Sequence, residues 1–194
     1  NLYYASELKP LMINPYFHKN INDKIVGKFL YKQYINAPDT IFRLTYKLKP
    51  GEILKFQHGT LKKHKYWDIA TVYNYKQEKI SYGEAKEQLE FLLRDAILRR
   101  MTADVSVGEF LSGGYDSTLI CSIAQSLSSE PIRTYSIGFE DKEYDEAPFA
   151  RQVAKYLETN HTEYYISHNE MLDLVRSIPI YYDEPFADSS QICT

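Results

Sequence analysis

The sequence predicts an α/β fold, in which a parallel sheet with helices on both faces follows a β-rich segment. From residue 81 to the end, strand-like and helix-like patterns alternate, an order typical of parallel sheets covered on both faces. Before residue 67, short β-patterned runs separated by turns dominate. A glycine pair between a predicted strand and a predicted helix is the third observation, because such turns can cradle an anion.

The first part of the chain carries turn signals between its β-patterned runs. Lys49-Pro50-Gly51-Glu52 predicts a turn between two strands, and His58-Gly59-Thr60 predicts the turn of a hairpin. Residues 23–34 are weakly helical, and residues 68–79 are polar and aperiodic, as in a linker. The predicted strands span residues 2–5, 41–48, 52–57 and 61–66.

The second part opens on a predicted helix N-terminus. Ser81 and Glu84 form a capping box, and the helix after it extends to Met101. Its apolar residues lie on one face, at positions 85, 89, 92, 93, 96, 97 and 101. The remaining elements are a strand at 105–111, a helix at 117–127 that Pro131 limits, a strand at 132–138, a helix at 147–157, a strand at 162–166 and a helix at 171–178.

Composition excludes several classes of protein. The formal net charge is −3, and Lys9, Lys62, Lys63 and Lys65 suit solvated surface charge, so nucleic acid is not an expected partner. No apolar run approaches the roughly 20 residues that span a bilayer, and no signal-peptide pattern opens the chain, so we expect no membrane partner. Cys121 and Cys193 lack metal or redox spacing. Cys121 is expected in the core, which fits a reducing cytoplasm.

The glycine pair lies in the run Leu111-Ser112-Gly113-Gly114-Tyr115-Asp116-Ser117-Thr118. Two glycines let the backbone approach an anion, and the N-terminus of the following helix adds its positive end. The run lacks the lysine of a Walker loop, so backbone N–H groups are the expected donors and Asp116 is free to hold Mg²⁺ against a polyphosphate. The alternative is a turn without ligand, in which Asp116 caps the helix.

Ser-Gly-Gly-x-Asp-Ser at residues 112–117 resembles the pyrophosphate loop of the N-type ATP pyrophosphatases, which cleave ATP between the α- and β-phosphates. Upstream, residues 3–11 and 48–52 resemble the tail of a class II glutaminase domain. The flanks of the loop resemble the asparagine synthetase pattern at residues 135–140, 144–150, 153–163 and 182–190. The chain is therefore identified as a member of the glutamine-hydrolysing asparagine synthetase (type B) family.

The resemblance implies a division of the chain. Residues 1–67 would be the C-terminal part of the glutaminase (Ntn-type) domain, residues 68–80 a linker, and residues 81–194 the N-terminal part of the ATP pyrophosphatase domain. This second domain would have the adenine nucleotide α-hydrolase-like fold. Because the chain starts without methionine and stops shortly after a new segment begins, we expect a fragment.

The resemblance also implies a reaction, that of a cytoplasmic carbon–nitrogen ligase with ATP and Mg²⁺ as cofactors. The side-chain carboxylate of aspartate attacks the α-phosphate of ATP, and the resulting β-aspartyl-AMP reacts with ammonia, taken from glutamine, to give asparagine and AMP. Members of the family are often dimers, so the resemblance allows a homodimer, but no residue pattern indicates an interface and the oligomeric state stays open. The family's glutaminase cysteine and a second motif, Ser-Gly-Glu-Gly-x-Asp-Glu, are not among these residues, so the chain alone is expected to be inactive.

Site residues are carried over from the resemblance position by position. Asp116 would be the carboxylate associated with Mg²⁺, and Ser189 and Ser190 fall where the family has hydroxyl residues of the aspartate site. The implied contacts with ATP are made by Leu111, Ser112, Gly113, Gly114, Asp116, Ser117, Ile137 and Gly138. Leu111 and Ile137 equally suit core positions, and both roles can hold at once.

Other polar residues have simpler interpretations. Asp145 precedes a predicted helix, which favours capping over nucleotide contact, and His161 opens a strand without a partner cluster, which favours a structural role. Asp183-Glu184-Pro185 is either an acidic turn or part of a site. Two alternative functions stay open: a sister amidotransferase that acts on another carboxylate, such as a polysaccharide sugar or a β-lactam precursor, and a non-catalytic nucleotide-binding module.

Overall fold

The computed structural model describes residues 2–73 and 79–192. Its contacts divide the chain into two compact units. Unit 1 contains residues 1–77 and 173–194, and unit 2 contains residues 78–172. Unit 1 is therefore built from two separate stretches of chain, and the domain boundaries expected from the sequence stay a prediction.

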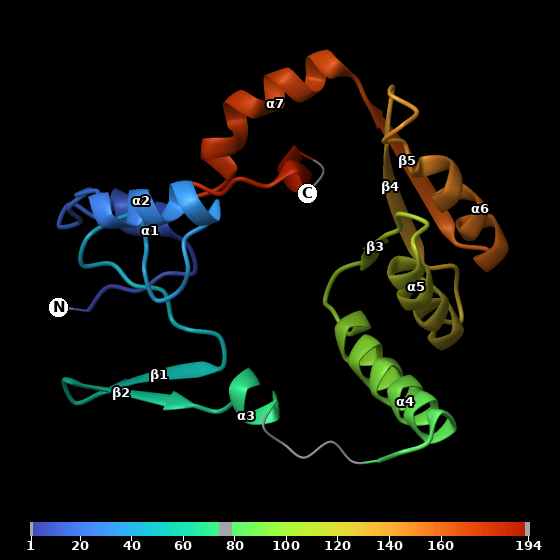
Figure 1. The fold of residues 1–194 in the computed structure, drawn as a ribbon, viewed down its shortest axis with the longest axis horizontal. Helices are drawn as coiled ribbons and strands as arrows, with labels where there is room; N and C mark the ends of the chain where they lie inside the picture. The colour runs from blue at the N-terminus through green and yellow to red at the C-terminus, as the bar shows by residue number, and fades with distance from the viewer. Residues whose placement is uncertain (1, 74–78, 193–194) are drawn as a thin grey trace. The chain divides into compact units, whose positions relative to one another are not determined.

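Unit 2 is organised around a parallel sheet of three strands in the order β3-β4-β5. The strands are β3 (Gly108–Phe110), β4 (Arg133–Phe139) and β5 (Asn160–Ile166). Gly108 pairs with Arg133, and Arg133 pairs with Asn160, so all three carboxyl ends lie at one edge of the sheet. The predicted α/β fold with a parallel sheet flanked by helices is thereby confirmed (Figure 1).

The helices within unit 2 are α4 (Tyr82–Met101), α5 (Tyr115–Leu127) and α6 (Ala147–Leu157), and α7 (His168–Tyr181) begins in unit 2 and continues into unit 1. The predicted capping box opens α4, because Ser81 Oγ accepts from the Glu84 N–H at 3.3 Å and the Glu84 carboxylate accepts from the Ser81 N–H at 2.8 Å. On the predicted apolar face of α4 only Ile97 is buried, where it packs against Ile123 and Ala124 of α5.

A cluster of small side chains forms the core between α5 and α6. Cys121 of α5 packs with Leu111, Ala150 and Ala154, and all four are buried. Cys121 is therefore a core residue, as predicted. Its burial, together with the nearby carboxylate of Glu109, raises the pKa of its thiol to about 12, so the reactive thiolate is absent at neutral pH. Cys193 lies outside the described residues.

Unit 1 contains short helices and one hairpin. The elements are α1 (Leu8–Ile13), α2 (Asp23–Lys32), β1 (Glu52–Gln57), β2 (Thr60–Lys65), α3 (Ile69–Tyr73) and the 3₁₀ helix η1 (Ser189–Ile192). The predicted hairpin is confirmed, since β1 and β2 pair antiparallel across the turn at His58 and Gly59. The predicted helix near residues 23–34 is present as α2, and its Ile25 forms a buried cluster with Ile35 and Ile41.

Two predicted strands are wrong. Residues 2–5 are irregular, and residues 41–48 make only isolated bridges, among them Ile21 with Phe42. Leu44 has a φ of +59°, which takes the backbone out of the extended conformation and interrupts any strand there. The strand predicted at 105–111 shortens to β3, because β4 begins only at Arg133 and leaves residues 105–107 unpaired.

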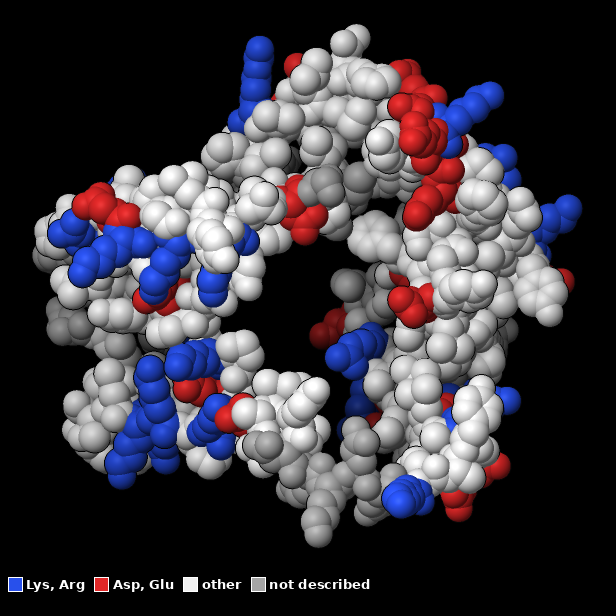
Figure 2. Space-filling model, viewed as in Figure 1, with Lys and Arg blue, Asp and Glu red and all other residues white. Residues whose placement is uncertain are grey.

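Two α-helices of the described chain, α1 and α3, and the 3₁₀ helix η1 were not predicted. Helix α3 lies inside residues 68–79, which the sequence predicts to be an irregular linker, and residues 74–78 of that stretch lie outside the described residues. No helix of the described chain is long and apolar enough to cross a bilayer. On the face drawn in Figure 2, acidic and basic side chains occur together on both units. The hairpin lysines Lys62 and Lys63 are exposed, as expected.

Candidate phosphate-binding loop

The glycine-rich run leaves the sheet at the carboxyl end of β3 and enters α5 directly. The Leu111 N–H donates to the Tyr135 carbonyl at 2.8 Å, which extends the ladder between β3 and β4 by one residue. Ile137 and Gly138 lie near the carboxyl end of β4, at the same edge of the parallel sheet. This edge is where open α/β sheets bind their ligands.

Gly113 and Gly114 satisfy different requirements. Gly113 has a φ of +81°, and a Cβ there would lie 2.7 Å from the Ala150 nitrogen and 2.8 Å from the Phe149 carbonyl carbon. Gly114 has an ordinary φ of −72° as the N-cap of α5, and a Cβ there would meet only Ser112 Oγ, at 3.4 Å. The backbone conformation at residue 113 therefore requires glycine, whereas glycine at residue 114 leaves free the space that a side chain would occupy at the start of α5.

Hydrogen bonds between the two serines close the loop. Ser112 Oγ lies 2.9 Å from Ser117 Oγ and accepts from the Gly114 N–H at 3.3 Å. Ser117 Oγ accepts from the Ser112 N–H and donates to the Gly114 carbonyl, both at 3.3 Å. Since Ser117 donates to the carbonyl, Ser112 donates to Ser117. Both hydroxyls therefore shape the loop.

The start of α5 offers unused backbone donors. Within the described chain, the N–H groups of Tyr115 and Asp116 donate to no acceptor, as is usual in the first turn of a helix. These donors and the positive end of the helix favour an anion at this position.

Asp116 is exposed in the first turn of α5, whose N-cap is Gly114, and within the described residues its side chain accepts no hydrogen bond from the helix N–H groups. Among the described residues no group of three or more His, Cys, Asp or Glu side chains could hold a metal ion. Mg²⁺ needs only one or two protein carboxylates when phosphate oxygens complete its shell, so an exposed Asp116 beside an anion cradle fits that ion.

The residues expected near adenosine differ in exposure. Leu111 is only 1% exposed and packs with Cys121 in the core, so its side chain has a structural role. Ile137 is half-buried at the end of β4. Gly138 is buried, and a Cβ there would lie 2.5 Å from the ring of Tyr165, so this glycine gives space to an aromatic side chain of β5.

Asp145 and His161 have the structural roles that the sequence favours. Asp145 Oδ1 accepts from the Ala147 N–H at 3.1 Å, at the start of α6, and from the Phe139 N–H at 3.4 Å, at the end of β4. His161 Nδ1 lies 2.9 Å from Thr134 Oγ1, and Nε2 lies 3.2 Å from Ser136 Oγ. Both ring nitrogens are thus engaged within the sheet.

Ser190 belongs to unit 1, in η1, and the side chain of Ser189 lies outside what the structure describes. The Ser190 N–H and hydroxyl both donate to Asp188 Oδ1, at 2.8 Å and 2.7 Å. Their assignment to a substrate site stays a prediction. Lys9, expected as solvated charge, instead pairs with Asp183 at 3.4 Å, a contact that no local sequence pattern could have indicated.

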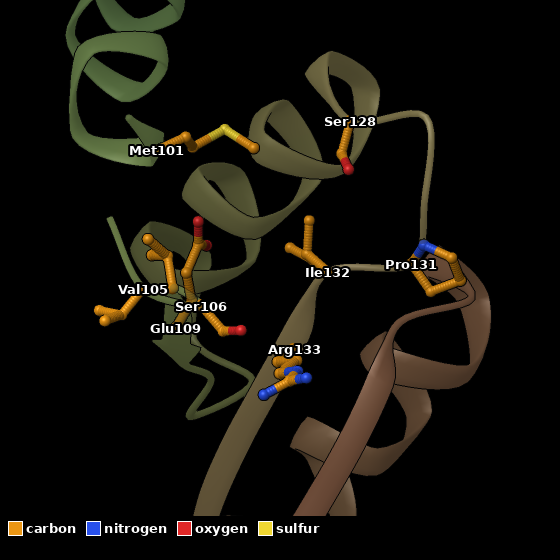
Figure 3. Close-up of a pocket in the computed structure, with 9 residues that line it drawn as sticks. Met101, Val105, Ser106, Glu109, Ser128, Pro131, Ile132 and Arg133 are labelled. Atoms are coloured by element: carbon orange, nitrogen blue, oxygen red, sulfur yellow. The ribbon is translucent and has the colours of Figure 1, made fainter. Parts of the chain in front are cut away.

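A cavity of about 320 Å³ lies at the opposite edge of the sheet, where β3 and β4 begin. Figure 3 shows Glu109 and Ile132 among the residues that line it, with Met101 of α4 on one side and Ser128, which follows α5, on the other. One carboxylate oxygen of Glu109 is buried and accepts no hydrogen bond within the described chain. Because the loop lies at the carboxyl edge, this cavity is no part of the candidate site.

Comparison with known proteins matches the sequence of this chain to two family models. The model of the asparagine synthase family matches residues 88–194, and that of a glutamine amidotransferase domain matches residues 1–67. A putative glutamine-hydrolysing asparagine synthetase of Methanocaldococcus jannaschii is 34% identical over 192 residues, which are 96% of this chain and 36% of that protein.

Two further relatives show the range of the similarity. Asparagine synthetase 1 of Bacillus subtilis is 27% identical over 98% of this chain and 29% of its own length. An amidase, chry2, of Gibberella zeae is 28% identical over 61% of this chain and 20% of its own length. The chain spans about a third of the length of the first relatives.

Proposed function

This chain belongs to the asparagine synthase family, and from that premise we propose that its protein converts aspartate to asparagine with ATP and with ammonia taken from glutamine. The match of residues 1–67 to a glutamine amidotransferase domain supports the glutamine-hydrolysing half of this proposal. The names of the relatives from M. jannaschii and B. subtilis support the same pairing of activities. AMP and pyrophosphate are the expected by-products.

The observation that carries the proposal is the loop between β3 and α5. Its left-handed Gly113 and its unused N–H groups suit an anion, and its exposed Asp116 suits the Mg²⁺ that accompanies a polyphosphate. In the proposed site, the N–H groups of Tyr115 and Asp116 hold the pyrophosphate part of ATP, with Ser112 and Ser117 keeping the loop in shape. Asp116 is the residue that would hold Mg²⁺, which when bound would supply positive charge against the pyrophosphate.

Carboxylate attack on an anionic phosphate needs alignment and charge neutralisation more than proton transfer. Ile137 and Gly138 are proposed to flank the adenosine part, and Ser189 and Ser190 the aspartate. Leu111 contributes by fixing the start of the loop from the core.

The test is pyrophosphate release from Mg-ATP by the full-length protein, with ammonia, in the presence and absence of aspartate. Release that depends on aspartate, with asparagine and AMP as products, is the expected result. Release that needs a different carboxylate would replace the proposal with a sister amidotransferase, an alternative that the amidase-named relative makes worth testing. No release with any acid would leave only nucleotide binding.

Asp116→Asn provides the test at the site. Loss of the charge should lower ATP turnover at least about 10-fold, a change in barrier of roughly 1.4 kcal/mol or more, and leave the fold intact because the side chain is exposed. Asp104→Asn, an exposed aspartate outside the loop, is the matched control and should retain full turnover. Equal turnover by Asp116→Asn and Asp104→Asn would remove Asp116 from the proposed mechanism.

A further inference from the structure

Two adjacent carboxylates follow α7 and are largely buried within unit 1. The side chain of Asp183 is 13% exposed and that of Glu184 is 15% exposed. Burial of two neighbouring negative charges is costly unless each finds a cation and hydrogen-bond donors. Their partners therefore show what holds this segment in place.

Asp183 forms a hydrogen bond with the first residue of α1, near the start of the chain. Its Oδ2 accepts the N–H of Leu8, the first residue of α1, where Glu7 as N-cap supplies no side-chain hydrogen bond. Its Oδ1 lies 3.4 Å from Lys9 Nζ. A carboxylate from 175 residues away thus replaces the missing local cap of this helix.

Lys9, in α1, binds the C-terminal end of α7. Its Nζ donates to the carbonyls of Ile180 at 3.0 Å and Tyr181 at 3.2 Å, in the last turn of that helix. Carbonyls at a helix C-terminus lack intrahelical donors and favour a cation. The end of α7 and the start of α1 therefore cap each other.

Glu184 reaches a different part of the first 67 residues. Its Oε2 accepts from the Ile41 N–H at 3.2 Å, and its Oε1 pairs with Lys47, which also donates to the Ile35 carbonyl at 2.8 Å. Three residues on, the Ala187 N–H donates to the Gln33 carbonyl at 2.8 Å, at the end of α2.

The residues that these hydrogen bonds and ion pairs join are matched by two different family models. Asp183, Glu184 and Ala187 lie in the region matched by the asparagine synthase model, and all their partners in residues 8–47 lie in the region matched by the glutamine amidotransferase model. We propose that Asp183 and Glu184 form a latch that fixes this synthetase segment on the glutaminase segment, so that ammonia released by one half-reaction is used by the other. The latch rests on the proposed function, and its two carboxylates act as positioning residues.

The geometry of the latch is tested by hydrogen–deuterium exchange of the full-length protein. Glu184→Gln keeps the shape of the side chain and removes its charge, and Asp183→Asn does the same for the first carboxylate. Exchange of the Ile41 N–H should speed up in Glu184→Gln and that of the Leu8 N–H in Asp183→Asn, while β4 in unit 2 keeps its protection. Unchanged exchange at both amides would overturn the latch, whether or not the protein makes asparagine.

Its role is tested by comparing synthesis from glutamine with synthesis from free ammonia. In Glu184→Gln, the yield of asparagine per glutamine hydrolysed should fall at least about 5-fold, at the low end of typical couplings between sites, and ammonia-dependent synthesis should stay within about twofold. Lys47→Met should act similarly, and the double variant should lose no more than either single one. Asp95→Asn, which breaks an exposed pair with Arg99 on α4, is the control.

A parallel fall of both activities, or an unchanged yield per glutamine, would overturn the positioning role. If the wild-type protein makes no asparagine even from ammonia, the proposed function fails instead, and the exchange experiment still decides whether the latch exists.

Discussion

Gly113 and Gly114 are neighbours in the chain, but the structure makes separate predictions for them. At Gly113 the left-handed φ disfavours any other residue, and α6 leaves no space for a Cβ. At Gly114 the backbone is ordinary and the nearest atom to a Cβ is Ser112 Oγ. A methyl group at residue 114 would occupy only the space where a phosphate is proposed to lie.

Gly113→Ala should lower the free energy of unfolding by about 2 kcal/mol, the usual cost of a left-handed alanine with a contact to relieve. Gly114→Ala should leave stability within about 0.5 kcal/mol and still weaken ATP binding at least about 10-fold. Urea unfolding and nucleotide titration measure the two effects. Equal ATP affinity in Gly114→Ala and wild type would show that no phosphate approaches this residue.

Much of the candidate site could be predicted from local pattern, since Ser112 to Ser117 lie between one strand and one helix. What could not be predicted is which contacts each of these residues makes. The serine hydroxyls bond to each other, and Leu111 packs against a helix that starts more than thirty residues later in the chain. Such contacts depend on tertiary packing, which the spacing of a motif does not encode.

At the scale of elements, a second capping box opens α7. The Ser167 N–H and hydroxyl donate to Glu170 Oε2 at 2.8 Å and 2.7 Å, and the Tyr164 hydroxyl donates to Glu170 Oε1 at 2.7 Å. Ser-x-x-Glu at residues 167–170 carries the same signal as the box at Ser81, and it places the start of the helix earlier than the predicted residue 171.

The box at α7 predicts a pH dependence. Hydrogen bonds from the Ser167 N–H, the Ser167 hydroxyl and the Tyr164 hydroxyl lower the pKa of Glu170 to about 2 from its ordinary 4.5. Because the folded pKa is the lower one, the stabilisation is present above pH 4.5 and is lost as the pH falls toward 2.

Glu170→Gln should therefore lower the urea midpoint at pH 7 and approach the wild-type midpoint as the pH falls below 4.5. Carboxyl NMR titration of Glu170 gives the pKa directly. Glu87→Gln, an exposed site on α4, is the control. A Glu170 titration midpoint at the ordinary value would contradict the prediction.

Local signals explain which elements could be predicted. The hairpin, α4, α5 and α6 carry their own turns, caps and apolar stripes, and they form within a residue or two of the expected positions. α1 has no such signal, because its cap is Asp183, far along the chain. The apolar alternation near residues 41–48 suggests a strand, but only Ile41 and Phe42 pack in the cluster with Ile25 and Ile35, whereas Leu44 is exposed and has a positive φ.

At the scale of the whole molecule, unit 1 is discontinuous. Residues 173–194 pack with residues 1–77, although the order of elements along the chain places them after the parallel sheet of unit 2. No sequence pattern shows this arrangement, because Asp183-Glu184-Pro185 is equally compatible with a surface turn. The arrangement makes the first part of the chain dependent on its last part.

That dependence can be measured by shortening the chain. A chain that ends at Leu172 lacks Asp183, which caps α1, as well as Glu184 and Ala187, which bind Lys47 and Gln33. The amides of α1 and α2 should therefore exchange with solvent at least about 10-fold faster than in the intact chain. The strands of unit 2 and its helices α4, α5 and α6 should keep their protection, because their buried residues lie before Leu172. A chain that ends at Asp188 retains the latch and is the matched control, with α1 and α2 protected as in the intact chain. Equal protection of α1 and α2 in the two shortened chains would mean that unit 1 folds without its last segment, and Asp183 and Glu184 would then lose the structural role assigned to them.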